Sequence, residues 1–453
     1  MQNDFGTGKI WKIILAQSVP LMFAQLVHLL YNVVDRIYIG HLEGIGSLAL
    51  TGIGLAFPLT TLIAAFTNLF ATGGAPLFAI ARGEGNEERA ETILSQVFGD
   101  LLFTSVILFL LSWFFRKPIL YAFGASDTSY VYADQYLRIY LWGTLAAMLA
   151  TGLNGFINAS GYPKIGMMTV FLGAFLNLIL DPVFIFVFHM NVAGAALATV
   201  ISQIASAVWA VSFFTGTNAV YRIDFTKILP DFGLLREIIP IGLAGFVVQG
   251  TNATVQIVCN RVLRQYGGDL YVGIMTVINS VREILSLPVQ SLSNGTQPVL
   301  SYNYGAKKYS RIKEGIRVST IAGFIYTALA WAAVLLFPRQ LFSIFTSSAE
   351  MIEAGTPALN MYFFGFIFMT FQFSGQSAFT ALKCSKRAVF FSIFRKVIIV
   401  VPLTILLPKM GYGVNGVWMA EPVSNLVGGL AAFTTMYLTL YRKLPADGET
   451  AHI

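Results

Sequence analysis

The sequence predicts an all-α membrane protein with about twelve transmembrane helices in two pseudo-symmetric six-helix bundles, both termini being cytoplasmic. Of the 453 residues, 56% are hydrophobic and only 11% are charged, whereas soluble domains have roughly a quarter charged residues. So few charges would not cover the surface of a soluble fold of this length. Apolar stretches of membrane-spanning length follow one another along the chain, and its two halves resemble each other.

Each predicted helix is an apolar stretch of about 20 residues or more, the length that crosses a bilayer, bounded by Gly, Pro or clustered charges. A polar segment, Met1 to Gly8, precedes the first stretch, which has no small-residue cleavage site, so we interpret it as a retained helix rather than a signal peptide. In chain order the predicted helices are 12–38, 50–80, 92–115, 130–158, 165–188, 192–215, 234–262, 270–301, 316–337, 355–382, 388–408 and 413–440.

Positive charge predicts the orientation, because Lys and Arg near helix ends stay in the cytoplasm. Placing both termini and loops 2–3, 4–5, 6–7, 8–9 and 10–11 on one side collects eighteen Lys and Arg there. The remaining loops hold six, namely Arg116, Lys117, Arg261, Arg264, Arg339 and Lys409. Both termini are therefore expected in the cytoplasm.

The two halves of the chain repeat each other at an offset near 220 residues. "SVPLMFAQ" at 18–25 corresponds to "IIPIGLAG" at 238–245, which pairs Pro20 with Pro240. This offset predicts an N-terminal bundle at 1–217, a cytoplasmic linker at 218–231 and a C-terminal bundle at 232–453. Both copies would start on the same membrane face, with the substrate path between them.

Polar residues follow one face of the first predicted helix. Gln25, His28, Asn32 and Asp35 are spaced by three, four and three residues, which places them on the same side of an α-helix. An ionised carboxylate at membrane depth is costly, so Asp35 is read as a functional group. The alternative is that Asp35, near a helix end, reaches water beside Arg36.

A second polar group lies on the fifth and sixth predicted helices. Asn177 and Asp181 are four residues apart on one face, and Thr199, Gln203 and Ser206 form a stripe on the next helix. Oxygen ligands from these helices and the first would suit a proton or a small hard cation such as Na⁺. A plain interhelical hydrogen bond is the alternative for the Asn177 and Asp181 pair.

The second half carries amides where the first half carries acids. Its deep acid, Glu421, would handle a cation, recognise a charged drug or pack the helix. Together with Gln25, His28, Asn32 and Gln203 from the first half, the candidates for lining a substrate cavity are Gln249, Asn252, Gln256, Glu283, Gln372, Gln376 and Glu421.

Several functional classes find no support in the sequence. We find no Walker A, GxSxG or HExxH motif, and no loop is long enough for a nucleotide-binding domain. Despite the formal charge of +7, Lys and Arg form no basic face with interleaved aromatics, so a nucleic-acid role is not expected. Cys259 and Cys384 lack metal-ligand spacing. We therefore expect no enzyme activity, no bound metal and no cofactor. The one expected ligand of this kind is a coupling ion.

Four motifs give the chain a family resemblance over essentially its whole length. They are "NVVDRIYIGHLEG" at 32–44, "NASGYPKIGMMTV" at 158–170, "NLILDPVFIF" at 177–186 and "GTQPVLSYNYGAKKYSRIKEG" at 295–315. With these motifs the sequence resembles the bacterial branch of the multidrug and toxic compound extrusion (MATE) family. The resemblance implies multidrug efflux by rocking between outward-open and inward-open states.

The resemblance also implies residue roles. The family's first-half cation site falls on Asp35, Asn177, Asp181 and Thr199, and its bending helix-1 proline falls on Pro20. In one subfamily the cation-linked acids lie in the second half. Here amides replace most of them, and only Glu283 is an approximate match, which favours the first-half site.

The resulting hypothesis is a cation-coupled antiporter, using H⁺ or Na⁺, that exports organic cations and amphipathic drugs across the bacterial plasma (inner) membrane by alternating access. Its partners would be small drug molecules and the lipid bilayer, and one copy would suffice for transport. Two alternatives remain, a lipid-linked oligosaccharide flippase of the same superfamily and a transport-inactive sensor or assembly protein. In a flippase, Arg282 and Arg138 would be the candidate cations for binding the pyrophosphate.

Overall fold

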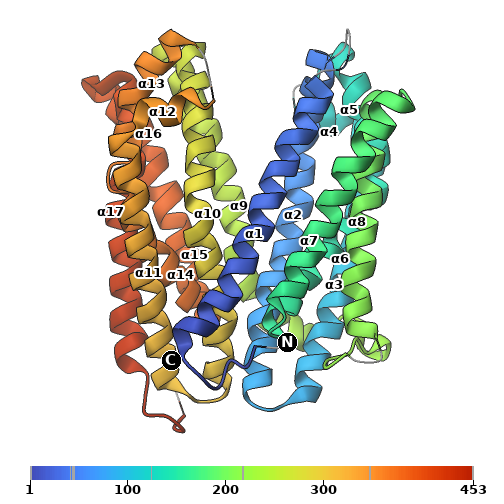
Figure 1. Cartoon of the computed structure of the whole chain (residues 1–453), viewed down its shortest axis with the longest axis vertical. Coiled ribbons are helices and arrows are strands. Elements are labelled where there is room, and N and C mark those ends of the chain that lie inside the picture. The colour runs from blue at the N-terminus through green and yellow to red at the C-terminus, as the bar shows by residue number, and fades with distance from the viewer. Residues whose placement is uncertain are drawn as a thin grey trace. The chain divides into compact units, whose positions relative to one another are not determined.

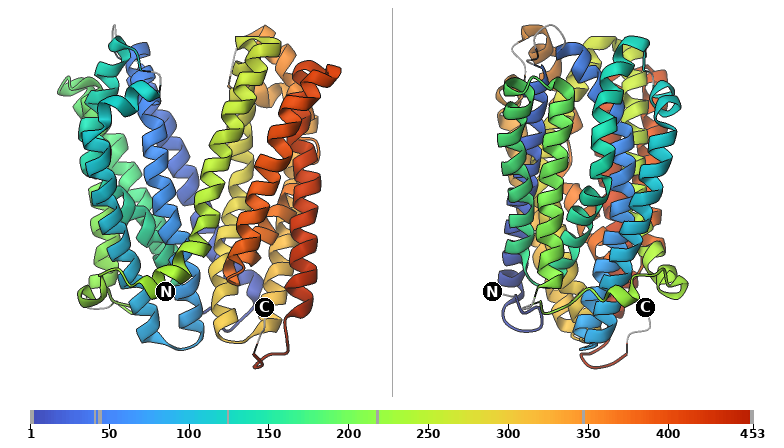
Figure 2. Two further views of the ribbon diagram at one scale, coloured as in Figure 1. Left: turned by 180° about the vertical axis from the view of Figure 1, so that it is seen from behind. Right: turned by 90° about the vertical axis from the view of Figure 1, so that its right-hand side faces the viewer.

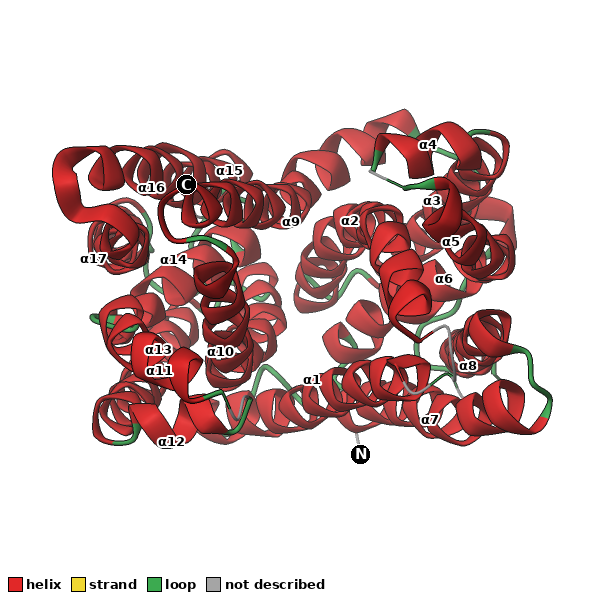
Figure 3. Ribbon diagram, turned by 90° about the horizontal axis from the view of Figure 1, so that it is seen from above, coloured by secondary structure: helices red, strands yellow, loops and turns green. Residues whose placement is uncertain are grey.

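The structure is a computed structural model of the chain, and every secondary-structure element that it describes is a helix (Figures 1 and 3). It describes residues 3–40, 42, 46–123, 125–216, 219–345 and 348–450. Within these ranges the side chains of residues 32, 36, 37, 40, 46–48, 50, 51, 253 and 269 are outside the description. The predicted all-α class is confirmed.

Long α-helices separated by short turns make up the chain. Those of the first half are α1 (Ile10–Gly40), α2 (Gly46–Gly83), α3 (Glu87–Phe114), α4 (Arg116–Ala122), α5 (Asp127–Tyr140), α6 (Thr144–Ala159), α7 (Pro163–Pro182) and α8 (Asn191–Thr215). Those of the second half are α9 (Phe232–Gly267), α10 (Asp269–Gly305), α11 (Tyr309–Leu336), α12 (Pro338–Ser343), α13 (Ala349–Tyr362), α14 (Met369–Ala381), α15 (Ser385–Ile393), α16 (Val401–Leu407) and α17 (Gly413–Thr439).

Nine stretches among the described residues are long and apolar enough to cross a membrane. The last of them, Ser385–Lys443, is 59 residues long and contains Gly411 and Gly413, both with positive φ, so it holds two helical arms rather than one. Two more predicted helices are each divided into two shorter helices, and none of these shorter helices is long enough to be among the nine candidate spans. The predicted set of about twelve segments is therefore matched in order, with two of them broken.

The two interrupted helices break at matching places in the two halves. The predicted helix 130–158 is divided into α5 and α6 by a 3₁₀ turn at Leu141–Gly143. The predicted helix 355–382 is divided into α13 and α14 around Gly365, whose φ of 74° is left-handed. Glycine has no Cβ to clash in that conformation, so the chain can break there at little cost. The continuous helices predicted for these segments are wrong at these breaks.

Contacts divide the chain into two compact units. Unit 1 contains residues 1–3 and 23–242, and unit 2 contains residues 4–22 and 243–453. The long helices within each unit run side by side (Figure 2). This division differs from the predicted bundles, because the first part of α1 packs in unit 2 and the first part of α9 packs in unit 1. Pro20 and Pro240 each lie two residues before the point where their helix leaves its first unit.

Glycines allow these first helical parts to pack closely. In unit 2, Gly295 of α10 lies against Ser18 of α1, where an added Cβ would meet the Ser18 backbone. In unit 1, Gly242 of α9 lies against the Leu69 backbone of α2. Small residues let membrane helices approach closely, and close packing is a main source of their association.

The predicted linker is packed onto α3 in unit 1. The Arg222 amide donates to Glu91 at 2.9 Å, the Asp224 amide to Ser95 at 2.8 Å, and the Asp231 amide to Gln96 at 3.0 Å. Three backbone bonds to side chains of one helix hold the segment in place.

Both ends of the described chain bind the turn between α10 and α11 within unit 2. Lys308 donates to the Gly6 carbonyl at 2.8 Å, and the Gly448 amide donates to the Lys307 carbonyl at 2.9 Å. Asp447 accepts bonds from the amide and hydroxyl of Ser310 at 2.7 and 2.5 Å. The two ends thus lie on the same end of this unit, as an even number of crossings requires. Their cytoplasmic placement stays a prediction.

Candidate functional site

A buried polar cluster lies in unit 1 where α7 meets α8. Asn177 and Asp181 are one turn apart on α7, and their exposed fractions are 3% and 1%. The Asn177 amide donates to Asp181 Oδ1 at 3.2 Å and lies 3.5 Å from Thr199 Oγ1 on α8. Thr199 in turn donates to the Ala195 carbonyl at 2.9 Å. The α-helix changes to a π-helix directly after Pro182, a feature frequent at functional sites.

Asp35 of α1 reaches this cluster. Its carboxyl lies close enough to that of Asp181 for the two charges to interact and for a hydrogen bond to form between them. Two carboxyl groups can share a hydrogen bond only when one of them carries a proton, because a carboxylate is an acceptor alone. The four residues predicted for the first-half ion site are therefore neighbours in the structure.

The sequence analysis missed the tyrosines beside these carboxylates. Tyr31 of α1 and Tyr136 of α5 lie within electrostatic range of both Asp35 and Asp181, and Tyr136 stacks on Tyr140 with ring centroids 5.5 Å apart. Tyr136 and Tyr140 are four residues apart on one helix face, a spacing that was available in the sequence but that gives no reason to link α5 with α1.

The other residues predicted on α1 occupy different surroundings. Pro20 is buried in the part of the helix that belongs to unit 2. Gln25 is half-buried, and the His28 ring packs edge-on against Tyr31 with centroids 4.9 Å apart. The side chain of Asn32 is outside the described residues.

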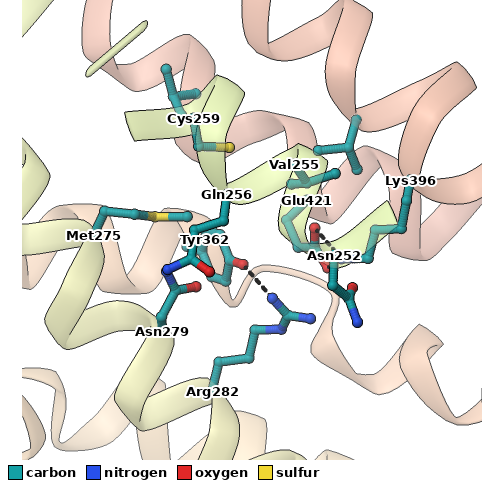
Figure 4. Close-up of a pocket in the computed structure, with 12 residues that line it drawn as sticks. Asn252, Val255, Gln256, Cys259, Met275, Asn279, Arg282, Tyr362, Lys396 and Glu421 are labelled. Atoms are coloured by element: carbon teal, nitrogen blue, oxygen red, sulfur yellow. Dashed lines mark hydrogen bonds and ion pairs between the residues drawn. The ribbon is translucent and has the colours of Figure 1, made fainter. Parts of the chain in front are cut away.

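A separate pocket lies in unit 2, where α9, α10, α13 and α17 meet the π-helical turn Phe394–Val400 (Figure 4). Its volume is about 80 Å³. Three of the predicted cavity residues, Asn252, Gln256 and Glu421, line it. The full lining is Asn252, Val255, Gln256, Cys259, Met275, Asn279, Arg282, Tyr362, Lys396, Val400, Val417 and Glu421.

Glu421 is the centre of a buried ion cluster that the sequence analysis missed. Arg395 donates to Glu421 Oε1 at 2.6 Å, and Lys396 donates to both carboxylate oxygens at 3.1 and 3.3 Å. All three side chains are less than a tenth exposed. The sequence signal was the adjacent basic pair inside the apolar run "FSIFRKVIIVV" at 391–401. Arg138, named above as a candidate cation, is instead bonded to Asp134 at 2.7 Å.

The remaining predicted cavity residues do not line this pocket. Gln203 lies in unit 1 against Gly143, and Gln249 is half-buried on α9. Glu283 is exposed, whereas Gln372 is 7% exposed on α14. Gln376 donates to the Ala388 carbonyl and to the Ser392 hydroxyl, both at 3.1 Å, so it joins α14 to α15.

Both halves of the chain match the model of one protein family. A family model described as MatE matches residues 20–183 and matches again at 240–406. The chain belongs to the MatE family. The two matches begin 220 residues apart (240 − 20), which confirms the offset predicted from Pro20 and Pro240. The MATE resemblance predicted from the four motifs is thereby also confirmed.

Individual MATE proteins align over nearly the whole chain. The multidrug export protein MepA of Staphylococcus aureus is 24% identical over 435 residues, covering 96% of this chain and 95% of MepA. MepA of Staphylococcus haemolyticus is 24% identical over 443 residues, covering 98% and 96%. Among solved structures, an outward-facing multidrug resistance MATE family transporter aligns with a TM-score of 0.90 at 22% identity over 98% of both chains. This last likeness establishes the MATE fold.

Proposed function

We propose that this MATE protein is an antiporter that exports organic cations and amphipathic drugs in exchange for H⁺ or Na⁺, with H⁺ favoured. The observation that carries the proposal is the close approach of the Asp35 and Asp181 carboxyl groups beside Asn177 and Thr199. A buried pair of acids that shares one proton can exchange that proton for another cation. The relatives reported above are named multidrug exporters, and nothing in their names favours the flippase alternative.

Coupling requires that the ion prefer one conformation over another, because a ligand that binds both states equally shifts nothing. Asp35 and Pro20 lie on the same helix, on either side of the point where α1 passes from unit 2 to unit 1. Proline removes a backbone hydrogen bond and weakens a helix locally. In this proposal, loss of the shared proton changes how α1 packs against α7, and the helix bends near Pro20.

The test is drug export by proteoliposomes that carry an imposed proton gradient. Asp35→Asn and Asp181→Asn each remove one acid of the pair, and we expect ethidium export to fall by at least about tenfold, the kinetic equivalent of 1.4 kcal/mol. Asp100→Asn is the matched control, because Asp100 is also a buried acid of unit 1 bonded to an amide, at 3.0 Å from Gln96. Wild-type export by either site variant would refute the proposal.

A second measurement distinguishes the two ions. Drug-induced alkalinisation inside sodium-free vesicles is expected for H⁺ exchange and should disappear in Asp181→Asn. Export that needs Na⁺ and moves no protons would assign the same oxygen cluster to Na⁺, for which the Asn177 and Thr199 oxygens are suitable ligands.

A further inference from the structure

The pocket of unit 2 carries more positive than negative charge. Arg282 and Lys396 line it, and Arg395 directly precedes Lys396 in the chain. The one carboxylate that acts on these three cations within the described part of the chain is Glu421. The two arginines alone, which stay protonated, outnumber the single carboxylate, so the cluster has an excess of positive charge.

The hydrogen bonds show which cation lacks an anion. Glu421 accepts bonds from both Arg395 and Lys396. Arg282 is bonded instead to the hydroxyl of Tyr362 at 3.3 Å, as Figure 4 shows. A tyrosine hydroxyl satisfies one N–H of a guanidinium group that has five. Arg282 therefore makes no hydrogen bond or ion pair with a carboxylate among the described residues, and the charge of Glu421 acts on it only through space.

Neutral donors surround the same space. The amides of Asn252, Gln256 and Asn279 line the pocket with Arg282 and Lys396, and all five side chains are drawn together in Figure 4. A water molecule needs about 10–15 Å³ of such volume, so a cavity of about 80 Å³ holds several waters or one small oxyanion. Guanidinium, ammonium and amide N–H groups are the donors that bind oxyanions.

We propose that this pocket is an oxyanion-binding site, which takes a carboxylate or phosphate group through Arg282 and Lys396. A bound oxyanion would neutralise the excess charge, and this is favourable because an uncompensated ion is expensive at membrane depth. The volume accommodates a single carboxylate or phosphate group.

The site goes beyond the proposed cation exchange, because it uses residues of unit 2 alone. It adds amphipathic anions and zwitterions to the molecules that the protein binds. Failure of anion binding would leave the roles of Asp35 and Asp181 untouched, and failure of their exchange assay would leave this pocket untouched.

The experiment measures binding to the purified full-length protein by titration calorimetry at constant ionic strength set with chloride. The probes are 4-phenylbutyrate, its methyl ester and inorganic phosphate. Wild-type protein should bind the acid at least about tenfold more tightly than the ester, the difference expected for one charge-assisted hydrogen bond. Competition by phosphate assigns the site to both oxyanions, and binding of the acid without such competition assigns it to carboxylates.

Arg282→Gln is the most informative variant, because it removes the unpaired cation and leaves Glu421 with both of its partners. It should weaken binding of the acid about tenfold and leave the ester unchanged, whereas Arg282→Lys should restore part of the affinity. Arg261→Gln is the matched control, since Arg261 is exposed on the same unit and does not line the pocket.

Two results would overturn the proposal. The first is equal affinity of the wild-type protein for the acid and its ester, which needs no variant. The second is unchanged acid binding by an Arg282→Gln protein whose melting temperature matches the wild type. If that variant does not fold, the comparison of acid and ester in the wild type decides.

Discussion

The buried clusters of the two units differ in the charged residues that they contain. In unit 1, Asp35 and Asp181 are two acids with amide and hydroxyl neighbours, an arrangement suited to a proton or a cation. In the buried ion cluster of unit 2, the carboxylate of Glu421 is bonded to two basic side chains, Arg395 and Lys396. A role for Glu421 in helix packing accounts for its bonds to Arg395 and Lys396. It does not account for Arg282, which makes no ion pair with a carboxylate in the part of the chain that the structure describes.

Removing the charge of Glu421 should destabilise the protein strongly. Glu421→Gln leaves Arg395 and Lys396 buried without their carboxylate, and breaking a buried ion pair on one side costs about 3–5 kcal/mol. We expect a clear fall in the melting temperature of the purified protein. The matched control is Glu283→Gln, because Glu283 is exposed. Equal melting temperatures for Glu421→Gln and wild type would show that the ion cluster contributes no stability.

At the scale of elements, the helices that change unit make close helix-to-helix contacts at glycines. The first part of α9 packs on α2, where Gly73 lies against Ile238 and Gly242 lies against Leu69. Both contacts bring one helix against the backbone of the other. A side chain at either glycine would push the helices apart, which explains why these positions are occupied by the smallest residue.

Two glycines of α9 provide a matched test of this packing. In Gly242→Ala, the new methyl group would collide with the Leu69 carbonyl, and we expect a loss of about 1–3 kcal/mol, as for overpacked cores. In Gly250→Ala, nothing lies within 4 Å of the added group, so the higher helix propensity of alanine should stabilise α9 by up to about 1 kcal/mol. Melting temperatures that move in the same direction for both variants would contradict this packing.

At the scale of the molecule, both ends of the described chain bind the turn between α10 and α11. Phe5 lies there fully buried, and its carbonyl accepts a bond from Asn303 at 2.9 Å. From the other end, Asp447 binds Ser310. Segments far apart in sequence thus meet at one turn of unit 2, and Asp447 itself lies beyond the last candidate membrane span, Ser385–Lys443.

The contact between Asp447 and Ser310 should depend on pH. The Ser310 hydroxyl, and then its amide, lower the pKa of the Asp447 carboxyl below its ordinary value. Because the folded pKa is lowered, the contact stabilises the fold above pH of about 4, the ordinary Asp value, and is lost as the pH falls through the lowered pKa.

Hydrogen exchange of the Ser310 amide, corrected for intrinsic rate, is the measurement for this contact. It should be constant from neutral pH down to about pH 4 and should rise below it. Asp447→Asn should raise the exchange rate already at neutral pH. Protection that is the same in Asp447→Asn and in the wild type would assign it to some other bond.

The sequence alone determined the fold class, the order of the helices and the repeat offset. Long apolar stretches indicate segments that lie in the bilayer, and charge clusters indicate where these segments end. Such a segment crosses the bilayer as a helix because its backbone hydrogen bonds must be made within the segment. The sequence also determined which helix face carries Asp35 and which carries Asn177 and Asp181. Residues three or four apart share a helix face whatever surrounds the helix.

Only the tertiary structure decided which polar faces meet. Tyr136 lies near Asp35 because helices about a hundred residues apart in the chain pack together. Arg282 likewise lies near Glu421 and Lys396 because distant helices pack together. The passage of α1 from unit 2 to unit 1 also has no local signal, since a helix has the same sequence pattern whichever unit it packs in. The physical reason is that helical periodicity identifies the buried side of a helix but not the partner that covers it.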